Sequence, residues 1–462
     1  MEKAISFGQE HIFGFWDELC EDGKRGLLEQ MREIDFDLMA RLIAEHIKAE
    51  SRKKFKGHLE PAPIIGLPQT KQEIRKHEEA RRIGEAALRA GKVAALVVAG
   101  GQGTRLGFDH PKGAFPIGPV SGKSLFQIHA EKILALSRRF DAPISWYIMT
   151  SGTNDQETRE FFQQNDFFGL GRGEVFFFQQ GMLAAVDKKG KFLMDAKDRI
   201  STSPNGHGGT LLALGDSGAL DDMRRRAVQE IYYFQVDNPL PRICDPAFVG
   251  FHLKAKADMS SKVLRKRDAE EKVGVVGILD GKTAVIEYSD LTKEDMYATL
   301  SDGSLKYSAG SIAIHMIDVD FVQRVLDVGF PLPYHPAEKK VPFIDETGRL
   351  HQPDKPNGTK FELFVFDALP LTKRSVTMET TREEFAPVKD AEGEDSPRTA
   401  KAAMTSLFAS WLEAVGINVP RTEDGKSKFA LEISPLFALD AEELAQKVDK
   451  NLTICGDLYL GK

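Results

Sequence analysis

A buried strand that runs directly into a glycine-rich loop leaves this chain few possible folds. Residues 93–98 are continuously apolar and rich in valine, which is typical of a parallel strand covered on both faces. The loop after it contains three glycines and two cationic residues: Gly100, Gly101, Gly103, Arg105 and Lys112. Because glycine has no Cβ, backbone N–H groups in such a loop can surround an anion. The stretch 96–113 therefore predicts a phosphate site, and the alternative is a plain strand-to-helix turn.

Two better-known glycine motifs do not fit this chain. A dinucleotide-binding loop needs Gly-x-Gly-x-x-Gly, but after Gly101 and Gly103 the next glycine is Gly107, one residue too late. A P-loop needs four residues between its first glycine and Gly-Lys-Ser or Gly-Lys-Thr. The stretch 118–124 has only three residues between Gly118 and Gly122-Lys123-Ser124, and no strand precedes it. The stretch 118–124 is interpreted as an ordinary turn.

The composition excludes several classes of protein. The 462 residues carry a net charge of −7, with 42% hydrophobic and 28% charged residues, so there is no basic surplus to favour nucleic acid or a membrane surface. No apolar run approaches the ~20 residues that span a bilayer, and the amino terminus lacks a signal-peptide layout. Cys20, Cys244 and Cys455 show no metal-binding spacing, and we interpret them as packing residues in a reducing compartment. We expect no nucleic-acid partner, no membrane and a cytoplasmic location, while the oligomeric state stays open.

More than one domain is expected, because domains usually contain ~100–200 residues. Apolar residues recur at mostly three- and four-residue spacing between Leu27 and Ile43, which predicts a helical N-terminal region over residues 1–90. A hydrophilic loop at 390–398 suggests a second boundary. We expect a main α/β domain over 91–395 and a small C-terminal α+β domain over 396–462.

Strands and helices alternate after the glycine loop. The apolar spacing predicts helices over 124–140 and 152–165 and strands over 144–150 and 174–180. This alternation predicts an α/β, Rossmann-like fold with a doubly wound parallel sheet. In such sheets, ligands bind at the carboxyl ends of the strands.

Polar residues follow two of the expected strands at that edge. Gln180 ends the strand 174–180, and its amide can pair with a nucleobase, although a surface glutamine is the alternative. Asp237 follows the apolar run that begins at Tyr232. A carboxylate there can bind Mg²⁺, which prefers oxygen ligands and keeps substrate phosphates among them. We therefore expect Mg²⁺ as the cofactor and Asp237 as its ligand, the alternative being an Asp-Asn turn.

Two later stretches add candidate ligand contacts. His207 lies between glycines in the loop 203–209, which favours a ligand contact over a plain turn residue. A turn at 280–281 joins two expected strands, and Glu287 ends the second, where its carboxylate could accept hydrogen bonds from sugar hydroxyls or be merely solvated. The aromatic run 361–366 is interpreted as core.

Several motifs together resemble one enzyme family. Residues 100–112 read Gly-Gly-x-Gly-Thr-Arg-Leu followed by Pro-Lys, a pattern similar to the signature of sugar nucleotidyltransferases. The further motifs lie at 177–183, 236–238, 285–289, 355–358, 364–367 and 384–389. Over nearly its full length the chain resembles the UDP-N-acetylhexosamine pyrophosphorylases. The resemblance implies a GT-A-like nucleotidyltransferase domain that makes a UDP-sugar and pyrophosphate from UTP and N-acetylhexosamine 1-phosphate.

The resemblance also implies two sets of binding residues. The UTP set is Val98, Ala99, Gly100, Gly101, Lys112, Gln180, Gly206, Asp237 and Lys360. The sugar-phosphate set is His207, Gly274, Glu287, Tyr288, Ser311 and Lys389. Arg105, Lys112 and Lys389 are the expected catalytic residues, because in-line phosphoryl transfer needs position and positive charge rather than a side-chain nucleophile.

Two departures from the family pattern leave the sugar open. The family usually has Gly-Asn-Gly-Gly where this chain has His207, and the Gly-His-Gly form is what UDP-glucose and broad UDP-sugar pyrophosphorylases show. Ser311 stands where the family usually has an asparagine that faces the sugar.

The alternatives are therefore a UDP-glucose or broad UDP-sugar pyrophosphorylase and a UDP-sugar-binding protein without turnover. A glycosyltransferase on a similar fold would need an Asp-x-Asp motif, which residues 236–238 do not supply.

Overall fold

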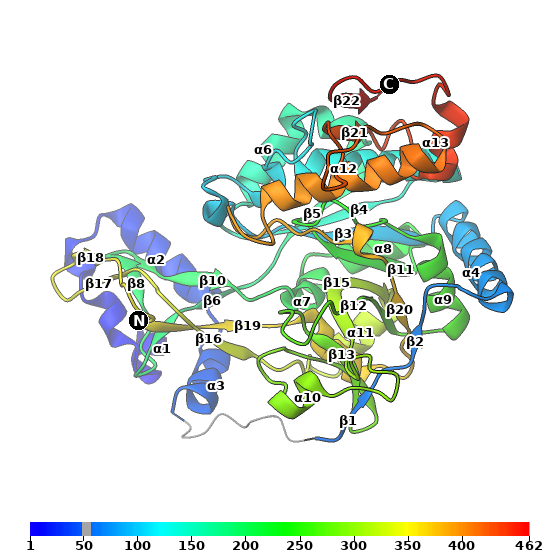
Figure 1. The fold of residues 1–462 in the computed structure, drawn as a ribbon. Coiled ribbons are helices and arrows are strands. Elements are labelled where there is room, and N and C mark those ends of the chain that lie inside the picture. Colours follow the sequence, from blue (N-terminus) through cyan, green and yellow to red (C-terminus); the bar gives the residue numbers. More distant parts are fainter. Residues whose placement is uncertain (49–56, 462) are drawn as a thin grey trace. The chain divides into compact units, whose positions relative to one another are not determined.

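The computed structural model describes residues 1–48 and 57–461 of the chain. Its contacts divide the protein into two compact units, each built from segments that are far apart in sequence (Figure 1). The first unit comprises Met1–Lys56, Gln180–Ala213 and Phe330–Asp367, and the second comprises Gly57–Gln179, Leu214–Gly329 and Ala368–Lys462. The three-part division expected from the sequence stays a prediction.

The second unit is built on an eleven-stranded sheet. Its main strand order is β2-β20-β12-β15-β11-β3-β4-β5, and β1, β13 and β14 pair beside this path. The bounds are β1 Leu59–Pro61, β2 Ile64–Ile65, β3 Val93–Val98, β4 Trp146–Thr150, β5 Val175–Gln179, β11 Glu230–Gln235, β12 Met259–Arg265, β13 Val275–Leu279, β14 Lys282–Ile286, β15 Ala309–Asp318 and β20 Thr377–Glu379.

Four neighbouring strands confirm the predicted α/β fold. β11, β3, β4 and β5 are mutually parallel. In their register Val98 of β3 pairs with both Gln235 and Met149, and Thr150 pairs with Gln179. The carboxyl ends of these strands therefore lie at one edge of the sheet, where the glycine loop begins.

The rest of the sheet is mixed, whereas the sequence predicted a parallel sheet. β15 is antiparallel to both β11 and β12, and β13 pairs antiparallel with β14. The turn between β13 and β14 consists of Asp280 and Gly281, both with positive φ. A turn this short can join only antiparallel strands.

Helices and short 3-10 turns cover this sheet. The α-helices are α4 Lys71–Arg89, α5 Leu125–Phe140, α6 Asp155–Gln164, α8 Ala219–Arg225, α9 Pro246–Ala255, α10 Lys293–Tyr297, α11 Val319–Asp327, α12 Pro397–Ala414 and α13 Ala441–Lys447. The 3-10 turns are η3 Thr104–Leu106, η4 Lys112–Ala114, η5 Asp166–Gly169, η6 Arg172–Glu174 and η8 Arg382–Glu384. In Figure 1, α12 and α13 lie beside the two-stranded sheet of β21 (Leu431–Ile433) and β22 (Leu458–Leu460).

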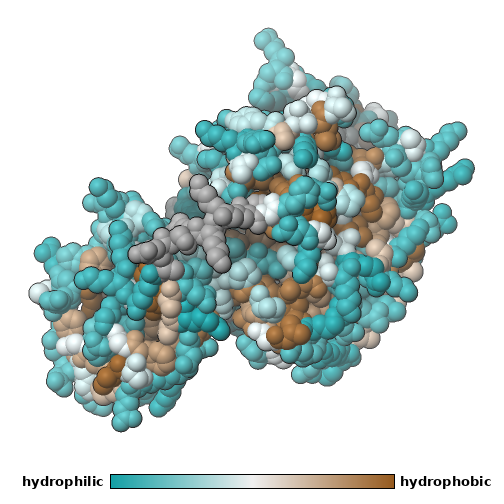
Figure 2. Space-filling model, turned by 90° about the horizontal axis from the view of Figure 1, so that it is seen from below, coloured by the Kyte–Doolittle hydropathy of each residue, from teal (hydrophilic) through white to brown (hydrophobic). Residues whose placement is uncertain are grey.

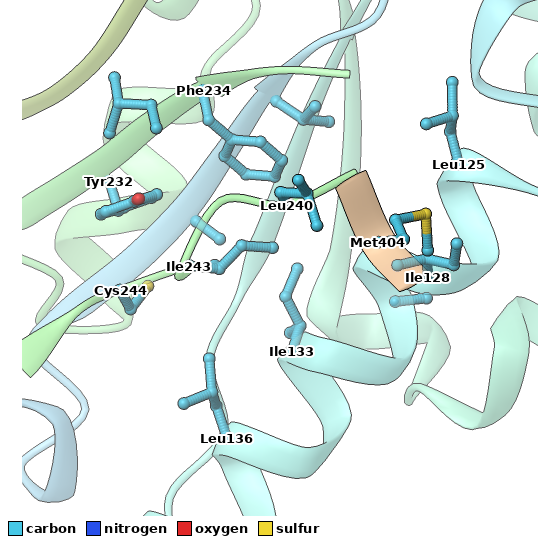
Figure 3. Close-up of a cluster of buried hydrophobic side chains, with 14 of the residues drawn as sticks. Leu125, Ile128, Ile133, Leu136, Tyr232, Phe234, Leu240, Ile243, Cys244 and Met404 are labelled. Atoms are coloured by element: carbon cyan, nitrogen blue, oxygen red, sulfur yellow. The ribbon is translucent and has the colours of Figure 1, made fainter. Parts of the chain in front are cut away.

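The main core of the second unit joins β11 to α5 and α12. Figure 3 shows Tyr232 and Phe234 of β11 with Ile133 of α5, and Met404 of α12 packs in the same cluster. All four side chains are buried. The packing fixes β11, whose carboxyl end carries Asp237, against a helix that follows the glycine loop.

Helices α4 and α9 touch through two glycines. A Cβ on Gly84 would lie 1.9 Å from the Pro246 carbonyl oxygen, and one on Gly250 would lie 1.7 Å from the Ala80 carbonyl oxygen. We expect Gly250→Ala to lower the free energy of unfolding by about 1–3 kcal/mol, because the two backbones must move apart. Chemical denaturation measures this loss. Gly26→Ala in α2 (Glu21–Glu33) is the control, since a Cβ there meets nothing within 4 Å. A control that lost as much stability would contradict the explanation.

The first unit has its own core. Leu27, Met31, Leu42 and Ile43 pack together with Phe361, which confirms the predicted helical periodicity of the N-terminal segment. The helical elements are α1 Glu2–Ser6, η1 Glu10–Phe13, η2 Trp16–Glu18, α2 Glu21–Glu33 and α3 Phe36–His46. The strands are β6 Met182–Ala184, β7 Val186–Asp187, β8 Met194–Ala196, β9 Arg199–Ile200, β10 Thr202–Pro204, β16 His335–Lys339, β17 Phe343–Ile344, β18 Leu350–His351 and β19 Gly358–Glu362. Two elements, α7 Gly209–Asp216 and η7 Val365–Leu371, continue from this unit into the second.

Hydrophilic and hydrophobic residues are interspersed on the face in Figure 2. Among residues 1–48 and 57–461, no helix has the length and apolar character needed to cross a membrane. Of the three cysteines only Cys244 is buried, so the expected packing role is wrong for Cys20 and Cys455.

Candidate active site

The glycine loop after β3 is held from the neighbouring strand. Asn154 donates its side-chain amide to the carbonyls of Ala99 and Gly101 at 2.8 and 3.2 Å, and the Ser151 hydroxyl donates to the Gly100 carbonyl at 2.8 Å. These bonds fix the carbonyl groups of the loop. In the described part of the chain, the N–H groups of Gly100 and Gly101 donate to no protein acceptor. The loop therefore offers two fixed amides to an anion.

The sequence analysis did not identify Ser151 and Asn154. The available signal was their position, because polar residues directly follow the predicted strand 144–150 at the edge where the glycine loop begins. Their role depends on hydrogen bonds to a loop about 50 residues earlier, which no local pattern reveals.

Arg105 and Lys112 lie in the 3-10 turns η3 and η4 of the same loop. The Lys112 backbone N–H donates to the Gly101 carbonyl at 3.1 Å, which folds the second half of the loop back onto the glycines. The Lys112 Nζ lies 3.8 Å from Oδ2 of Asp237, and both side chains are mostly buried. The Arg105 side chain is exposed. The structure thus places both predicted cations on the glycine loop and Lys112 beside Asp237.

Asp237 joins this loop to the segment that carries Lys389. The Val388 N–H donates to the Asp237 carbonyl at 2.9 Å, and the Lys389 ammonium donates to Asp395 at 2.8 Å. Burial raises the pKa of the Asp237 carboxyl, and the positive charges of Lys112 and Lys389 partly offset this rise. This edge of the sheet therefore holds a desolvated carboxylate, Asp237, whose charge is stabilised by the two lysines Lys112 and Lys389.

Asn238 clamps the two segments together. Its amide nitrogen donates to the Glu384 carbonyl at 2.7 Å, and its amide oxygen accepts from the Ala386 N–H at 3.1 Å. Because the same side chain both donates and accepts, it fixes the spacing between the end of β11 and the 384–389 segment. The sequence analysis included Asn238 only in the possible Asp-Asn turn and in the motif 236–238.

A buried charge cluster of Lys262, Asp245 and Glu384 stabilises the segments that Asn238 links. The Lys262 ammonium on β12 contacts Asp245 at 2.7 Å and Glu384 at 2.8 Å, and its side chain is fully buried. Lys132 of α5 donates to the carbonyls of Pro239 and Pro241 at 2.6 and 3.0 Å. Burial lowers the pKa of the Lys132 ammonium to about 7. The segment after Asp237 is therefore fixed from β12 and from α5.

Three of the predicted sugar-contact residues meet at the ends of β13, β14 and β15. The Ser311 N–H donates to the Gly274 carbonyl at 2.8 Å. A Cβ on Gly274 would lie 3.2 Å from Oε1 of Glu287 and 2.8 Å from the Val285 side chain, so only glycine fits there without displacement. Tyr288 follows Glu287 and is exposed. Gly274, Glu287 and Ser311 therefore lie together at this end of the three strands.

Four predicted site residues belong to the first unit: Gln180, Gly206, His207 and Lys360. Gln180 is buried. Gly206 has φ of +86°, and a Cβ there would lie 2.5 Å from the Leu363 carbonyl oxygen. Burial lowers the pKa of the Lys360 ammonium on β19. The other predicted site residues, from Val98 to Lys389, all lie in the second unit.

The second glycine loop is paired with the aromatic run. The Leu363 N–H donates to the Asn205 carbonyl at 2.7 Å, and the Gly208 N–H donates to the Leu363 carbonyl at 2.8 Å. Phe366 is buried as expected, whereas Phe364 is half-buried and its ring stacks on His207. The prediction that Phe364 belongs to the core is therefore only partly right.

A separate cavity of about 1070 Å³ lies within the second unit. Its walls come mainly from α4, α5, α12, α13 and the segments 239–247 and 378–384. No predicted site residue lines it, so this cavity is distinct from the glycine-loop edge.

Comparison with known proteins decides the family. The family model described as UTP–glucose-1-phosphate uridylyltransferase matches residues 66–424. The chain belongs to this family. Within the uridylyltransferase family, the chain is similar to UDP-N-acetylglucosamine pyrophosphorylase of Saccharomyces cerevisiae, with 37% identity over 96% of this chain and 95% of the relative.

Two solved structures differ in how similar they are to this chain, both in sequence identity and in TM-score. The uridine diphosphate N-acetylglucosamine pyrophosphorylase of Trypanosoma brucei, solved with an inhibitor, has 27% identity and a TM-score of 0.81, and the match covers 96% of this chain and 93% of that one. A UDP-glucose phosphorylase of the same organism has 16% identity and a TM-score of 0.61, over 92% of this chain and 87% of that one. The second likeness shows the fold alone.

Proposed function

We propose that this chain is a uridylyltransferase that forms UDP-N-acetylglucosamine and pyrophosphate from UTP and N-acetylglucosamine 1-phosphate. One observation carries the proposal, the meeting of two lysine-bearing segments at Asp237. The Lys112 Nζ lies 3.8 Å from Oδ2 of Asp237, and the Val388 N–H donates to the Asp237 carbonyl, which holds the neighbouring residue Lys389 at the same place. This arrangement gives two cations around one carboxylate beside free loop amides. The activity named for the yeast relative supports the same reaction.

The proposed roles follow the charges of the two substrates. The amides after Val98 and Ala99, at Gly100 and Gly101, bind phosphate oxygens of UTP, and Arg105 and Lys112 neutralise its β- and γ-phosphates. Lys389 binds the phosphate of the incoming sugar 1-phosphate. The other proposed UTP contacts are Gln180, Gly206, Asp237 and Lys360. The other proposed sugar-phosphate contacts are His207, Gly274, Glu287, Tyr288 and Ser311.

The reaction needs no covalent enzyme intermediate. A phosphate oxygen of the sugar 1-phosphate attacks the α-phosphorus of UTP and forms a new O–P bond. The bond from the α-phosphorus to the bridging oxygen breaks in line, and pyrophosphate leaves with that electron pair. Arg105 and Lys112 stabilise the charge that develops on the leaving group, because fixed cations in a partly dehydrated site need no reorganisation.

The donors around Asp237 fit Mg²⁺, which we propose as the cofactor. No group of three His, Cys, Asp or Glu side chains forms a metal cluster among residues 1–48 and 57–461. Mg²⁺ commonly uses only one or two carboxylates together with substrate phosphates, and the mostly buried Asp237 carboxylate provides one beside the anion-binding loop. Mg²⁺ would hold Asp237 and the phosphates together and reduce their charge. We also propose a cytoplasmic location, in keeping with the three free thiols.

A UDP-glucose or broad UDP-sugar pyrophosphorylase is the second candidate. His207 and Ser311 favour it, because both differ from the asparagines usual in the N-acetylhexosamine enzymes. A UDP-sugar-binding protein without turnover is the outcome if no sugar phosphate reacts.

A pyrophosphate-release assay with UTP tests these candidates. We expect kcat/KM to be highest with N-acetylglucosamine 1-phosphate, lower with N-acetylgalactosamine 1-phosphate and lowest with glucose 1-phosphate. Chelation of divalent cations should abolish release, and added Mg²⁺ should restore it. Preference for glucose 1-phosphate would support the second candidate, and no release with any substrate would support the binding protein.

A further inference from the structure

The loop 389–396 in the second unit closes around Lys389. The N–H groups of Lys389 and Asp390 both donate to the Asp395 carbonyl, at 2.7 and 3.1 Å. The Lys389 ammonium donates to Oδ2 of the same aspartate at 2.8 Å. Asp395 therefore holds Lys389 through its backbone and through its side chain. The two side chains keep 43% and 39% of their surface exposed, so a ligand can still reach the ammonium.

The loop 389–396 is fixed at two further places. The Ala391 N–H donates to the Arg105 carbonyl at 3.1 Å, which joins this loop to the glycine loop after β3. At its other end, the buried Ser396 is the N-cap of α12. The Ser396 hydroxyl also donates to the Gly393 carbonyl at 2.9 Å. Asp395 thus lies in a loop that is bonded both to the glycine loop and to the first turn of a long helix.

The ion pair leaves part of the Lys389 ammonium open to a ligand. A lysine ammonium has three N–H donors and no acceptor. In the described part of the chain, the Lys389 ammonium donates only to Asp395, so two of its donors have no protein partner. A lysine that is unpaired before binding loses side-chain freedom when it binds a ligand. An ion pair that exists beforehand removes most of that loss, which is preorganisation of the binding group.

The charge of Asp395 itself works against an anionic ligand. Burial raises the pKa of the Asp237 carboxyl, Lys112 and Lys389 lower it, and the negative charge of Asp395 raises it further. Asp395 is thus close enough to act on the same group of charges, in which two carboxylates balance two lysines. A residue that served only to attract phosphate would be a cation. The benefit of a carboxylate at this place is therefore orientation of Lys389, at the cost of some repulsion.

We propose that Asp395 is a positioning residue for Lys389, which it holds so that the two remaining ammonium donors meet the phosphate of the sugar 1-phosphate during the reaction. The inference rests on the proposed uridylyltransferase function for the identity of the ligand, and it deepens that function. Asp395 touches neither substrate. Its two effects are separable, because orientation of the lysine raises kcat whereas repulsion by the carboxylate weakens binding of the sugar phosphate.

Steady-state kinetics test the two effects. We expect Asp395→Ala to lower kcat for pyrophosphate release about tenfold, because the ammonium is no longer held in place. The KM for N-acetylglucosamine 1-phosphate should not rise, because the repelling charge is gone. Asp395→Asn keeps an oxygen acceptor for the ammonium and should lose less kcat than the alanine variant. An unchanged kcat in Asp395→Ala, or a raised KM as its sole effect, would overturn the positioning role.

Glu392→Gln is the matched control. Glu392 is an exposed carboxylate in the same loop, and it forms no ion pair with any described residue. Its kcat and KM should equal those of the parent. A loss in Glu392→Gln as large as that in Asp395→Ala would show that any charge removed from this loop has the same effect, and would overturn the specific role of Asp395.

A double-mutant cycle separates positioning from general support of the loop. In a chain that carries Lys389→Met, no ammonium is left to hold, so added Asp395→Ala should cause no further fall in kcat. A further tenfold fall in that background would show that Asp395 acts through the fold of the loop rather than through Lys389, and would overturn the proposal.

Lysine labelling gives a readout that needs no catalysis. The full chain is treated with a trace of an amine-acetylating reagent, and mass spectrometry compares labelling of Lys389 with that of Lys76, an exposed lysine on α4. We expect Asp395→Ala to raise the relative labelling of Lys389 about two- to fivefold, the range for loss of an exposed ion pair, and Glu392→Gln to leave it unchanged. Equal labelling in parent and Asp395→Ala would overturn the proposal. If the parent releases no pyrophosphate with any sugar phosphate, the proposed function fails, whereas the labelling still decides whether Asp395 holds Lys389.

Discussion

Lys112→Ala is expected to lower kcat for pyrophosphate release by roughly 10²–10³, the cost of removing one fixed charge from a transition state. The Lys112 ammonium lies on the loop whose Gly100 and Gly101 amides donate to no acceptor in the described residues, 3.8 Å from Asp237. Negative charge grows on the β- and γ-phosphates as the leaving group departs. The loss should therefore fall mainly on kcat, with a smaller change in the KM for UTP, measured by steady-state pyrophosphate release.

Two further variants make the Lys112 experiment specific. Lys76→Ala removes a lysine from the exposed side of α4 in the same unit, and its kcat should match the parent. Lys112→Arg keeps the charge but changes its geometry, so an intermediate rate is expected. Near-normal turnover of Lys112→Ala would contradict the proposal that the glycine loop binds the triphosphate.

The glycine-loop edge of the sheet was predictable because its signals are local. An apolar run next to glycines and cations at 93–112 identifies a strand and an anion loop without knowledge of the partners. Asp237 was predictable for the same reason, since it directly follows an apolar run. The structure confirms the parallel strands β3 and β11 that end beside each other.

The contacts that fix this edge were not predictable. Asn154 reaches a loop about 50 residues earlier, and Asn238 bridges to a segment about 146 residues later. A side-chain amide has no periodic signal, and its role depends on which backbone groups the fold brings within 3 Å. The antiparallel pairing of β15 with β11 and β12 was not predicted, because the strand–helix alternation in the sequence covers only residues 93–180. The turn at 280–281 between β13 and β14 was predicted, since it is a local signal.

The division into two units also lies beyond local pattern. The first unit combines the N-terminal helices with segments 180–213 and 330–367, and its core joins Leu27 and Met39 to Phe361. Periodicity identified α2 and α3 as helices. It could not reveal which strands cover their apolar faces.

The last prediction concerns Lys262, whose ammonium is fully buried between Asp245 and Glu384. We expect Lys262→Met to lower the free energy of unfolding by about 3–5 kcal/mol, because both carboxylates lose the Lys262 charge while they stay buried and Arg242 is left as the cation that attracts Asp245. Urea denaturation at pH 7.5 measures this loss. Lys282→Met on β14 is the matched control, since Lys282 is exposed in the same sheet, and its stability should stay within about 0.5 kcal/mol of the parent.

The pH dependence gives the Lys262 prediction a second test. In the parent, the attraction of Lys262 and Arg242 outweighs burial and holds the pKa of Asp245 below its usual value. Its folded-state pKa is therefore below the unfolded one, so this stability is present above the unfolded value and is lost as the pH falls further. Without Lys262, burial raises the pKa of Asp245, and protonation then favours the folded state.

The stability deficit of Lys262→Met should accordingly shrink between pH 7.5 and pH 5, and Asp245→Asn with Glu384→Gln in the same chain should recover part of it. A deficit that stays constant with pH would show that lost packing, rather than uncompensated charge, causes the destabilisation. The Glu384 carboxylate also accepts hydrogen bonds from the Arg242 N–H and the Thr380 hydroxyl, and its backbone is bonded by Asn238. Pyrophosphate release by Lys262→Met should therefore fall as well, although Asp245 and Glu384, the ion-pair partners of Lys262, are not proposed substrate contacts.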